Sequence, residues 1–354
     1  MERRTVLITG VAGRWGRRLA RQLVKFPIVR VLGMDVRAPE RPIDGVEYIQ
    51  ADLRDPLLVE LLRKERVEGI LHMVFASGLG NDGTTLSAEQ AFQTNVMGTV
   101  ELLAAANAAG VKQVVLKSST LVYGAHVDNP LYLHEDAPLR GRTGEPAIGQ
   151  RYEIEKAVGQ FRRNHPDLKI VVLRFPGIIG ASGASSLMRY LAQPAPPVLL
   201  GFDPLFQVVH EADVVGSILH AMATEADGVF NVAAEGVFAL SQLIRQIGRQ
   251  PLPVFHPLAY GLSKLPGLRR NAKVLRAVPF ELDYLRYPWV ADVSKMREEL
   301  GYEPRHTAEE AVEAFRSALR LHRFAGIAQL PPVAKDGIRA FLNRAGRKTE
   351  KEVS

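Results

Sequence analysis

The sequence of 354 residues contains no cysteine, which excludes disulfide bonds, thiolate metal sites and a cysteine nucleophile. Long apolar runs are also missing. The longest stretches without Asp, Glu, Lys or Arg are Phe175 to Met188 and Gln250 to Ser263, 14 residues each, whereas a membrane-spanning helix needs about 20. The N-terminus leads directly into Val6 to Thr9 without a signal-peptide pattern. We therefore expect a cytoplasmic protein with no transmembrane segment.

The net charge is +7, but the excess of positive over negative charge is confined to two short segments. The segment from Lys264 to Arg276 holds five bases and no acid, and Lys335 to Ser354 holds six bases against three acids. The remaining 321 residues sum to −1, so the body of the protein lacks a field that attracts polyanions, and we expect no nucleic-acid partner. The segment 264–276 is either a solvated amphipathic helix, a cationic lid over an anionic substrate, or a peripheral contact with acidic lipid.

Apolar β-branched runs alternate with helical patterns along the first two thirds of the chain. The predicted strands are 6–9, 31–34, 70–75, 114–117 and 170–174, and the predicted helices are 15–25, 57–64, 88–108 and 150–163. This alternation is typical of an α/β protein with a doubly wound parallel sheet of the Rossmann type. A further strand is expected at 228–232, with helices at 240–248, 293–300 and 308–322.

The domain organisation follows from where this alternation weakens. We expect a dinucleotide-binding domain in residues 1–175 together with about 206–235. Residues 176–205 and 236–325 are expected to form a smaller substrate-binding part, and residues 326–354 a C-terminal tail, because they contain two adjacent prolines and end in a charged stretch.

A glycine-rich turn lies between the first predicted strand and the first predicted helix. Such a turn lets the backbone approach a pyrophosphate at the N-terminus of the helix. Its candidate cofactor-binding residues are Gly10, Gly13, Arg14, Trp15 and Gly16. The second strand ends at Asp35, 19 residues beyond Gly16, close to the ~20 expected for a ribose-binding acid. The sequence therefore predicts a bound dinucleotide.

Asp35 favours NAD over NADP, because a carboxylate accepts hydrogen bonds from ribose hydroxyls and repels a 2′-phosphate. Arg14 and Arg37 weaken this preference, since either guanidinium could pair with that phosphate.

Tyr152 and Lys156 lie four residues apart in a helical pattern, so they share one helix face. A neighbouring ammonium favours the phenolate form of a tyrosine, which makes it a usable acid/base. Ser118, Ser119 and Thr120 follow the strand 114–117, at the carboxyl end where α/β sheets place their ligands.

With these motifs the chain resembles the extended short-chain dehydrogenases/reductases of the NAD-dependent epimerase/dehydratase family, from Val6 to about Arg316. The resemblance implies that Tyr152 is the catalytic acid/base, that Lys156 holds the nicotinamide ribose and that Ser119, with Thr120 as its neighbouring alternative, binds the reacting oxygen. It implies further cofactor contacts from Asp52, Leu53, Val74, Phe75, Asn95, Lys156 and Phe175. The implied reaction is hydride transfer at a secondary alcohol or ketone carbon, without a metal.

Two departures from this family concern the substrate. Members that act on nucleotide sugars usually carry Asn and Arg where this chain has Pro176 and Gln207, and both would touch a diphosphate. The substrate is therefore either a nucleotide sugar held by other cations, such as Arg140, Arg142 and Arg151, or an apolar sterol-like or β-keto compound. A non-catalytic dinucleotide-sensing protein is a third hypothesis, which the presence of Ser119, Tyr152 and Lys156 argues against.

The resemblance also implies a homodimer that pairs the helices 88–108 and 150–163 with their copies. The first helix has apolar residues at suitable spacing for such a contact, namely Ala91, Val96, Val100 and Leu103.

Overall fold

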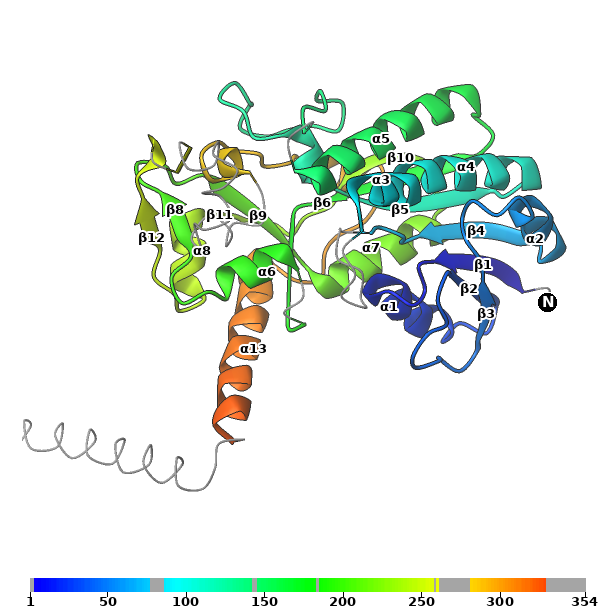
Figure 1. Cartoon of the computed structure of the whole chain (residues 1–354), viewed down its shortest axis with the longest axis horizontal. Helices are drawn as coiled ribbons and strands as arrows, with labels where there is room; N and C mark the ends of the chain where they lie inside the picture. The colour runs from blue at the N-terminus through cyan, green and yellow to red at the C-terminus, as the bar shows by residue number, and fades with distance from the viewer. Residues whose placement is uncertain are drawn as a thin grey trace, which may run out of the picture.

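The computed structural model describes residues 3–76, 86–141, 145–182, 185–257, 259–260 and 281–328. Its main element is a sheet of seven parallel strands (Figure 1). Their order is β10 (Gly228–Asn231), β6 (Lys169–Phe175), β5 (Gln113–Ser119), β4 (Val67–His72), β1 (Arg4–Thr9), β2 (Val29–Asp35) and β3 (Val46–Gln50). The chain runs outward from β1 to β3 and then returns to β4 on the other side of β1. The carboxyl ends of β1 and β4 therefore flank a topological switch point, where open α/β sheets bind ligands.

Helices cover both faces of this sheet. One layer consists of α1 (Arg14–Leu23) and α7 (Glu211–Ala223), and the other of α2 (Leu58–Lys64), α4 (Gly98–Ala109) and α5 (Pro146–Asn164). Successive residues of β1 pack into different cores, with Ile8 beside α1 and α7 and Leu7 beside α2 and α4. A sheet buried on both faces explains why its strands read as continuous apolar runs in the sequence.

The predicted α/β class and the predicted strands of the main sheet are confirmed, and one strand of that sheet was missed. β3 reads Val46-Glu47-Tyr48-Ile49-Gln50, and all five residues are at least partly exposed because it forms the edge of the sheet. Its short, mixed pattern carries too little apolar signal to predict a strand.

The predicted helix 88–108 is divided into three segments. A short α3 (Ala88–Phe92) is followed by a π-helical turn (Gln93–Met97) and then by α4. Of the four residues that we expected at a dimer contact, Ala91, Val96 and Leu103 are buried within the chain itself, and Val100 is partly exposed. The three buried residues are therefore not available to a second copy, and the homodimer stays a prediction that rests on the family resemblance alone.

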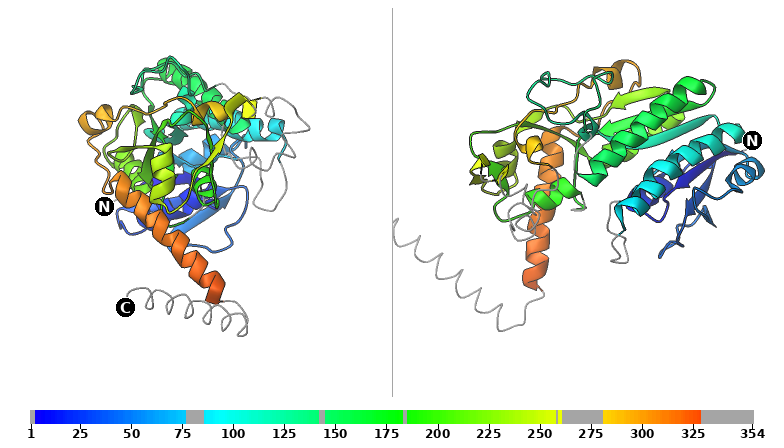
Figure 2. Two further views of the ribbon diagram at one scale, coloured as in Figure 1. Left: turned by 90° about the vertical axis from the view of Figure 1, so that its left-hand side faces the viewer. Right: turned by 45° about the horizontal axis from the view of Figure 1, so that its top comes forward.

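A smaller part lies beside the carboxyl ends of the main strands (Figures 1 and 2). It contains a sheet in the order β11 (Val237–Ala239), β9 (Leu205–His210) and β7 (Gly177–Ile179), and the strand pair β8 (Pro197–Leu199) and β12 (Leu252–Val254). Its helices are α6 (Ser186–Leu191), α8 (Leu240–Gln246) and α13 (Ala308–Ala328), with a 3₁₀ turn at Leu282–Leu285. The region 206–235 is shared, because β9 pairs within this smaller sheet while α7 and β10 belong to the main one.

The remaining described helices are short or project from the body. A 3₁₀ turn (Thr120–Tyr123) follows β5, and α12 (Ser294–Glu298) packs on β10. Both views of Figure 2 show α13 leaving the smaller part at its C-terminal end. Among the described residues, no helix combines the length and apolarity needed to span a membrane, and the cytoplasmic location stays a prediction.

Candidate functional site

The glycine-rich turn joins β1 to α1 in a conformation that side chains would block. Gly10 has a φ of +71°, and a Cβ at this position would lie 3.0 Å from the backbone nitrogen of Val74 on the neighbouring β4 segment. A Cβ at Gly16 would lie 2.3 Å from the carbonyl oxygen of Gly10. The residue before α1 is Gly13, which provides no side-chain cap, so the first backbone N–H groups of α1 have no side-chain acceptor there.

Asp35 stands at the carboxyl end of β2, beside this turn. Its Oδ2 accepts a hydrogen bond of 3.1 Å from the backbone N–H of Ala12, and its Oδ1 accepts one of 3.3 Å from Arg37. These two bonds fix the carboxylate between the glycine turn and the exposed Arg37 side chain. Asp35 therefore lies beside the glycine turn at the end of β2, and its contact with a ribose stays a prediction.

A cavity of about 710 Å³ runs along the carboxyl ends of β2, β1, β4 and β5. Ten of the predicted cofactor residues line it: Gly10, Gly13, Arg14, Trp15, Asp35, Arg37, Asp52, Leu53, Val74 and Phe75. The β1–β2–β3 half is lined by Asp35 and Asp52, whose carboxylate pairs with Arg54 at 2.8 Å. The β4–β5 half is lined by Met73 to Ala76, Lys117 and Ser118.

Three predicted cofactor residues support the cavity from behind. Asn95 is buried. Its Oδ1 accepts a hydrogen bond of 2.7 Å from the N–H of Ala76, and its Nδ2 donates one of 2.8 Å to the Ala76 carbonyl. Asn95 thus fixes the backbone that follows β4. Phe175 is fully buried at the end of β6, and Gly16 permits the close contact between α1 and the turn.

The predicted catalytic residues are not among those that line the cavity. Lys156 is exposed, and Tyr152 and Ser119 are half-buried. The Ser119 hydroxyl accepts a bond of 3.3 Å from the backbone of Leu121. The α5 residues that line the cavity are instead Arg151, Ile154, Glu155 and Val158. Arg151 and Glu155 each precede one of the predicted residues, Tyr152 and Lys156, by one position. One residue of an α-helix corresponds to a rotation of about 100°, so the catalytic roles of Tyr152 and Lys156 stay a prediction.

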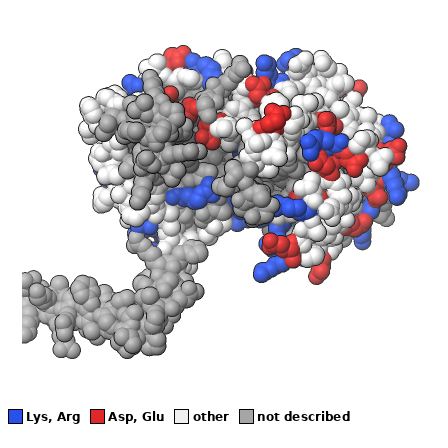
Figure 3. All heavy atoms as spheres, viewed as in Figure 1, with Lys and Arg blue, Asp and Glu red and all other residues white. Residues whose placement is uncertain are grey.

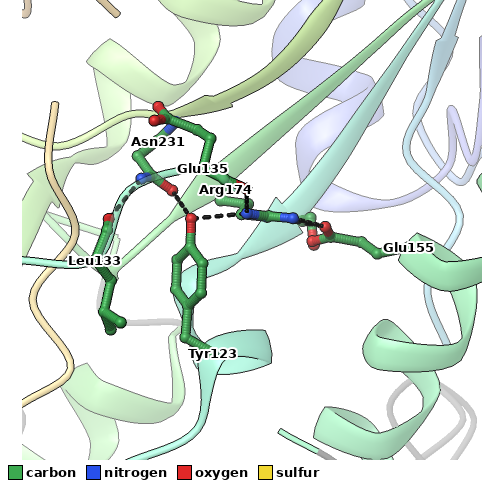
Figure 4. A network of polar contacts seen from close by, with 7 residues as sticks. Tyr123, Leu133, Glu135, Glu155, Arg174 and Asn231 are labelled. Atoms are coloured by element: carbon green, nitrogen blue, oxygen red, sulfur yellow. Dashed lines mark hydrogen bonds and ion pairs between the residues drawn. The ribbon is translucent and has the colours of Figure 1, made fainter. Parts of the chain in front are cut away.

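Glu155 belongs to a buried polar network that the sequence did not reveal (Figure 4). Its carboxylate accepts 2.8 and 2.6 Å bonds from the guanidinium of Arg174 and a further bond from the Ser118 hydroxyl. Arg174 also donates to the Tyr123 hydroxyl at 2.7 Å, which in turn donates to Asn231 at 2.7 Å. The network joins β5, β6, β10 and α5. Neither i,i+4 spacing nor a motif links these residues, so only the fold brings them together.

Lys117 and Arg151 also line the cavity, and neither was predicted as a cofactor contact. Burial, together with the nearby charges of Arg151 and Arg14, lowers the pKa of the Lys117 ammonium to about 7. Burial also lowers the pKa of Arg151 to about 10. The Arg151 guanidinium lies 3.6 Å from the Phe75 ring centroid and donates to the Ala147 carbonyl at 3.0 Å. Arg151 was predicted only as a possible substrate contact.

The other residues suggested as substrate contacts have different surroundings. Arg140 forms an exposed ion pair with Asp128 at 2.8 Å, and His134 lies 3.6 Å from Asp292. Arg142 and the basic segment 264–276 lie outside the described residues.

One cluster of possible metal ligands occurs among the described residues, formed by His210, Asp213 and His306. The buried Asp213 carboxylate already accepts bonds from the backbone N–H groups of Arg305 and His306, at 2.8 and 3.2 Å, and lies 2.8 Å from His306 Nδ1. These contacts assign Asp213 a structural role, tying α7 to the segment before α13.

The fold and the cavity together define a Rossmann-type α/β protein whose cleft has the parts of a dinucleotide site. The chain belongs to the NAD dependent epimerase/dehydratase family, whose profile matches residues 6–233. This membership confirms the predicted family and the predicted type of NAD-dependent enzyme.

Several relatives resemble the chain over nearly its whole length. An uncharacterized protein of Mycobacterium tuberculosis is 32% identical over 348 residues, covering 97% of this chain and 89% of the relative. A UDP-glucose 4-epimerase of Lactobacillus helveticus is 25% identical over 346 residues, covering 90% and 97%. The structure of a Thermotoga maritima UDP-glucose 4-epimerase with UDP-glucose superimposes with a TM-score of 0.67 at 19% identity, covering 90% and 99%. At that identity the similarity shows the fold alone.

The buried pair of Glu155 and Arg174 yields a stability prediction. Their side chains are only 3% and 4% exposed, so Arg174→Gln leaves a buried carboxylate unpaired, which costs about 3–5 kcal/mol of the free energy of unfolding. Urea denaturation measures this loss. Arg162→Gln is the matched control, because Arg162 pairs with Asp227 at a largely exposed site and should cost at most about 1 kcal/mol. Equal effects of the two substitutions would contradict the structural role of the network.

Proposed function

We propose that the chain binds NAD in the cavity and transfers hydride to or from a secondary alcohol or ketone carbon of a small molecule. One observation carries this proposal: a single continuous cavity combines a glycine cradle, an acid at the end of β2 and polar side chains at the end of β5. The cradle fits the backbone-to-pyrophosphate approach of such a cofactor, because a Cβ at Gly10 or Gly16 would collide with neighbouring backbone. When bound, the nicotinamide supplies the hydride acceptor or donor.

The chain's residues divide the work along the cavity. Asp35 and Asp52 line the half that fits the adenosine, since Asp35 faces the first turn of the motif and Asp52 follows β3. The open N–H groups of α1 lie at the centre, where the diphosphate belongs. The half that fits the nicotinamide is lined by Met73 to Ala76, Lys117 and Ser118. Trp15, in the first turn of α1, also lines the cavity.

The cofactor assignment predicts the effect of substituting Asp35. Asp35→Ala should weaken NAD binding about tenfold, because hydrogen bonds to the ribose are lost, and should reduce the preference for NAD over NADP. Asp35→Asn keeps an acceptor for Ala12 and removes only the charge, so it should mainly relieve the repulsion of NADP. Isothermal titration with both cofactors measures these changes, and Asp44→Ala, at an exposed position, is the control. Tighter binding of NADP by the wild type would overturn the assignment and favour Arg37 as a phosphate ligand.

The resemblance to the family indicates Tyr152, together with Lys156 and Ser119, as the residues that transfer the proton. These side chains do not line the cavity, and the Glu155–Arg174 pair fixes the orientation of α5. Tyr152 can therefore reach a reacting oxygen only if the substrate approaches beside Arg151. If Tyr152 is the acid/base, Tyr152→Phe should leave cofactor affinity nearly unchanged and slow hydride transfer by roughly 10²- to 10⁴-fold.

The measurement is the single-turnover absorbance change of bound nicotinamide with a substrate drawn from a panel of secondary alcohols, ketones and nucleotide sugars. Tyr48→Phe, at the far edge of the sheet on β3, is the control. Unchanged turnover in Tyr152→Phe would remove Tyr152 from the mechanism and leave the cofactor proposal intact.

The substrate we propose is not a nucleotide sugar bound through Pro176 and Gln207. Gln207 on β9 is buried, and its amide donates to the Ala291 carbonyl at 3.1 Å and accepts from the Ala291 N–H at 3.2 Å. Its polar atoms are therefore used to join two backbone segments. Pro176 is buried and has no N–H to donate. A diphosphate placed there would lack donors, and an unpaired buried charge is costly.

This proposal predicts that protein loaded with NAD does not bind UDP or UDP-glucose at micromolar concentration. Isothermal titration tests it, with the Thermotoga maritima UDP-glucose 4-epimerase as the positive control under the same conditions. Micromolar binding of either ligand would restore the nucleotide-sugar reading. Its absence would direct the search to uncharged or apolar alcohols and ketones.

A further inference from the structure

Two cationic side chains lie together in the β4–β5 half of the cavity. Lys117 is at the carboxyl end of β5, with its Nζ 5.4 Å from the ring centroid of Trp15 and 5.8 Å from that of Phe175. Arg151 on α5 covers the ring of Phe75. Both residues line the cavity, and each is close enough to the other for their charges to interact.

No carboxylate among the described residues neutralises this pair. The acidic residues that line the cavity are Asp35, Asp52 and Glu155. Asp35 and Asp52 lie in the other half, and Asp52 pairs with Arg54. Glu155 is nearer, but its two oxygens are taken by Arg174 and Ser118. Lys117 forms no ion pair or hydrogen bond with another described residue, and Arg151 bonds only to a backbone carbonyl. Within the part of the chain that the structure describes, the excess positive charge is therefore uncompensated.

The topology determines which part of a dinucleotide meets this charge. The glycine turn follows β1, and Asp35 at the end of β2 marks the adenosine side. The second half of the dinucleotide must then extend across the switch point toward β4 and β5. Lys117 and Arg151 consequently face the nicotinamide, whose ring carries a positive charge in NAD⁺ and none in NADH.

We infer that Lys117 and Arg151 make the site select the reduced cofactor, so that the protein binds NADH more tightly than NAD⁺. This inference rests on the proposed function. Like charges repel more strongly where burial reduces screening by water; Lys117 and Arg151 are half-buried, and the rings of Trp15, Phe175 and Phe75 lie against them. The same pair would stabilise the negative charge that develops on a carbonyl oxygen while the carbonyl carbon accepts the hydride and the C=O π electrons move to that oxygen.

The selection should depend on pH through Lys117. Its pKa of about 7 means that the ammonium loses its proton as the pH rises from 6 to 8.5, so NAD⁺ affinity should increase over this interval while NADH affinity changes less. The other groups that face Lys117 keep their charge over this interval. Arg14 and Arg151 stay protonated, Glu155 stays paired with Arg174, and the buried His72, with a pKa of about 4, stays neutral.

Isothermal titration of NAD⁺ and NADH at pH 6.5 and 8.5 tests the inference. In the wild type at pH 6.5 we expect NADH to bind about tenfold tighter than NAD⁺. Lys117→Met and Arg151→Gln should each reduce this ratio, mainly by improving NAD⁺ binding. Lys117→Arg keeps the charge at all pH values, so it should keep the ratio and abolish its pH dependence. Lys64→Met removes one charge from an exposed position on α2 and should leave the ratio unchanged.

The possible failures are distinguishable. Absence of binding by both cofactors would overturn the proposed function itself. Binding of both with a ratio that neither pH, Lys117→Met nor Arg151→Gln alters would overturn only the inference. If Lys117→Met does not fold, as judged by circular dichroism, the wild-type pH series and Lys117→Arg still decide the question.

Discussion

The buried ion pair between Glu155 and Arg174 fixes the rotation of α5 against the sheet, and the composition of the cavity depends on that rotation. Arg174 is anchored at the end of β6 by the Tyr123 hydroxyl and by the Glu135 carbonyl. Glu155 must point toward it, because an uncompensated carboxylate is expensive in a dry interior. The helix consequently turns Arg151, one turn earlier on the same face, toward the cavity and leaves Lys156 in solvent. One interaction therefore decides which charge the β4–β5 half of the cavity receives.

The same network explains which features of the fold and the cavity could be predicted from the sequence. The glycine turn, Asp35 and the alternation of strands and helices are local patterns, and each has its expected place in the fold. The rotation of α5 is not local, because Glu155 and Arg174 are 19 residues apart and their other partners lie still farther along the chain. The sequence shows that Tyr152 and Lys156 share one face of a helix, because they are four residues apart. It does not show whether that face is turned toward the sheet, because tertiary packing decides this. The edge strand β3 and the short strands of the smaller part were missed for a related reason, since their pairing rather than their composition makes them strands.

Lys117 illustrates a different limit of sequence reading. A lysine in an otherwise apolar strand is conspicuous, yet the sequence does not indicate which side of the sheet its ammonium reaches or what lies around it. The structure supplies both answers: Trp15 from α1, Phe175 from β6 and Arg151 from α5 surround it. Its lowered pKa results from this combination of apolar walls and like charges, neither of which is encoded near residue 117.

The polar groups of the two parts of the chain are used in opposite ways, and this contrast bears on specificity. In the smaller part, Gln207 bonds to the backbone at Ala291, and in α7 Asp213 bonds to the backbone at Arg305 and His306. These groups are satisfied internally and stabilise the packing of segments that are far apart in sequence, so they have little hydrogen-bonding capacity left for a ligand. In the cavity, by contrast, Lys117 forms no hydrogen bond to another described residue, and Arg151 forms one of the several it can donate. Unused donors therefore lie in the β4–β5 half of the cavity, whereas Gln207 and Asp213 are not among the residues that line it.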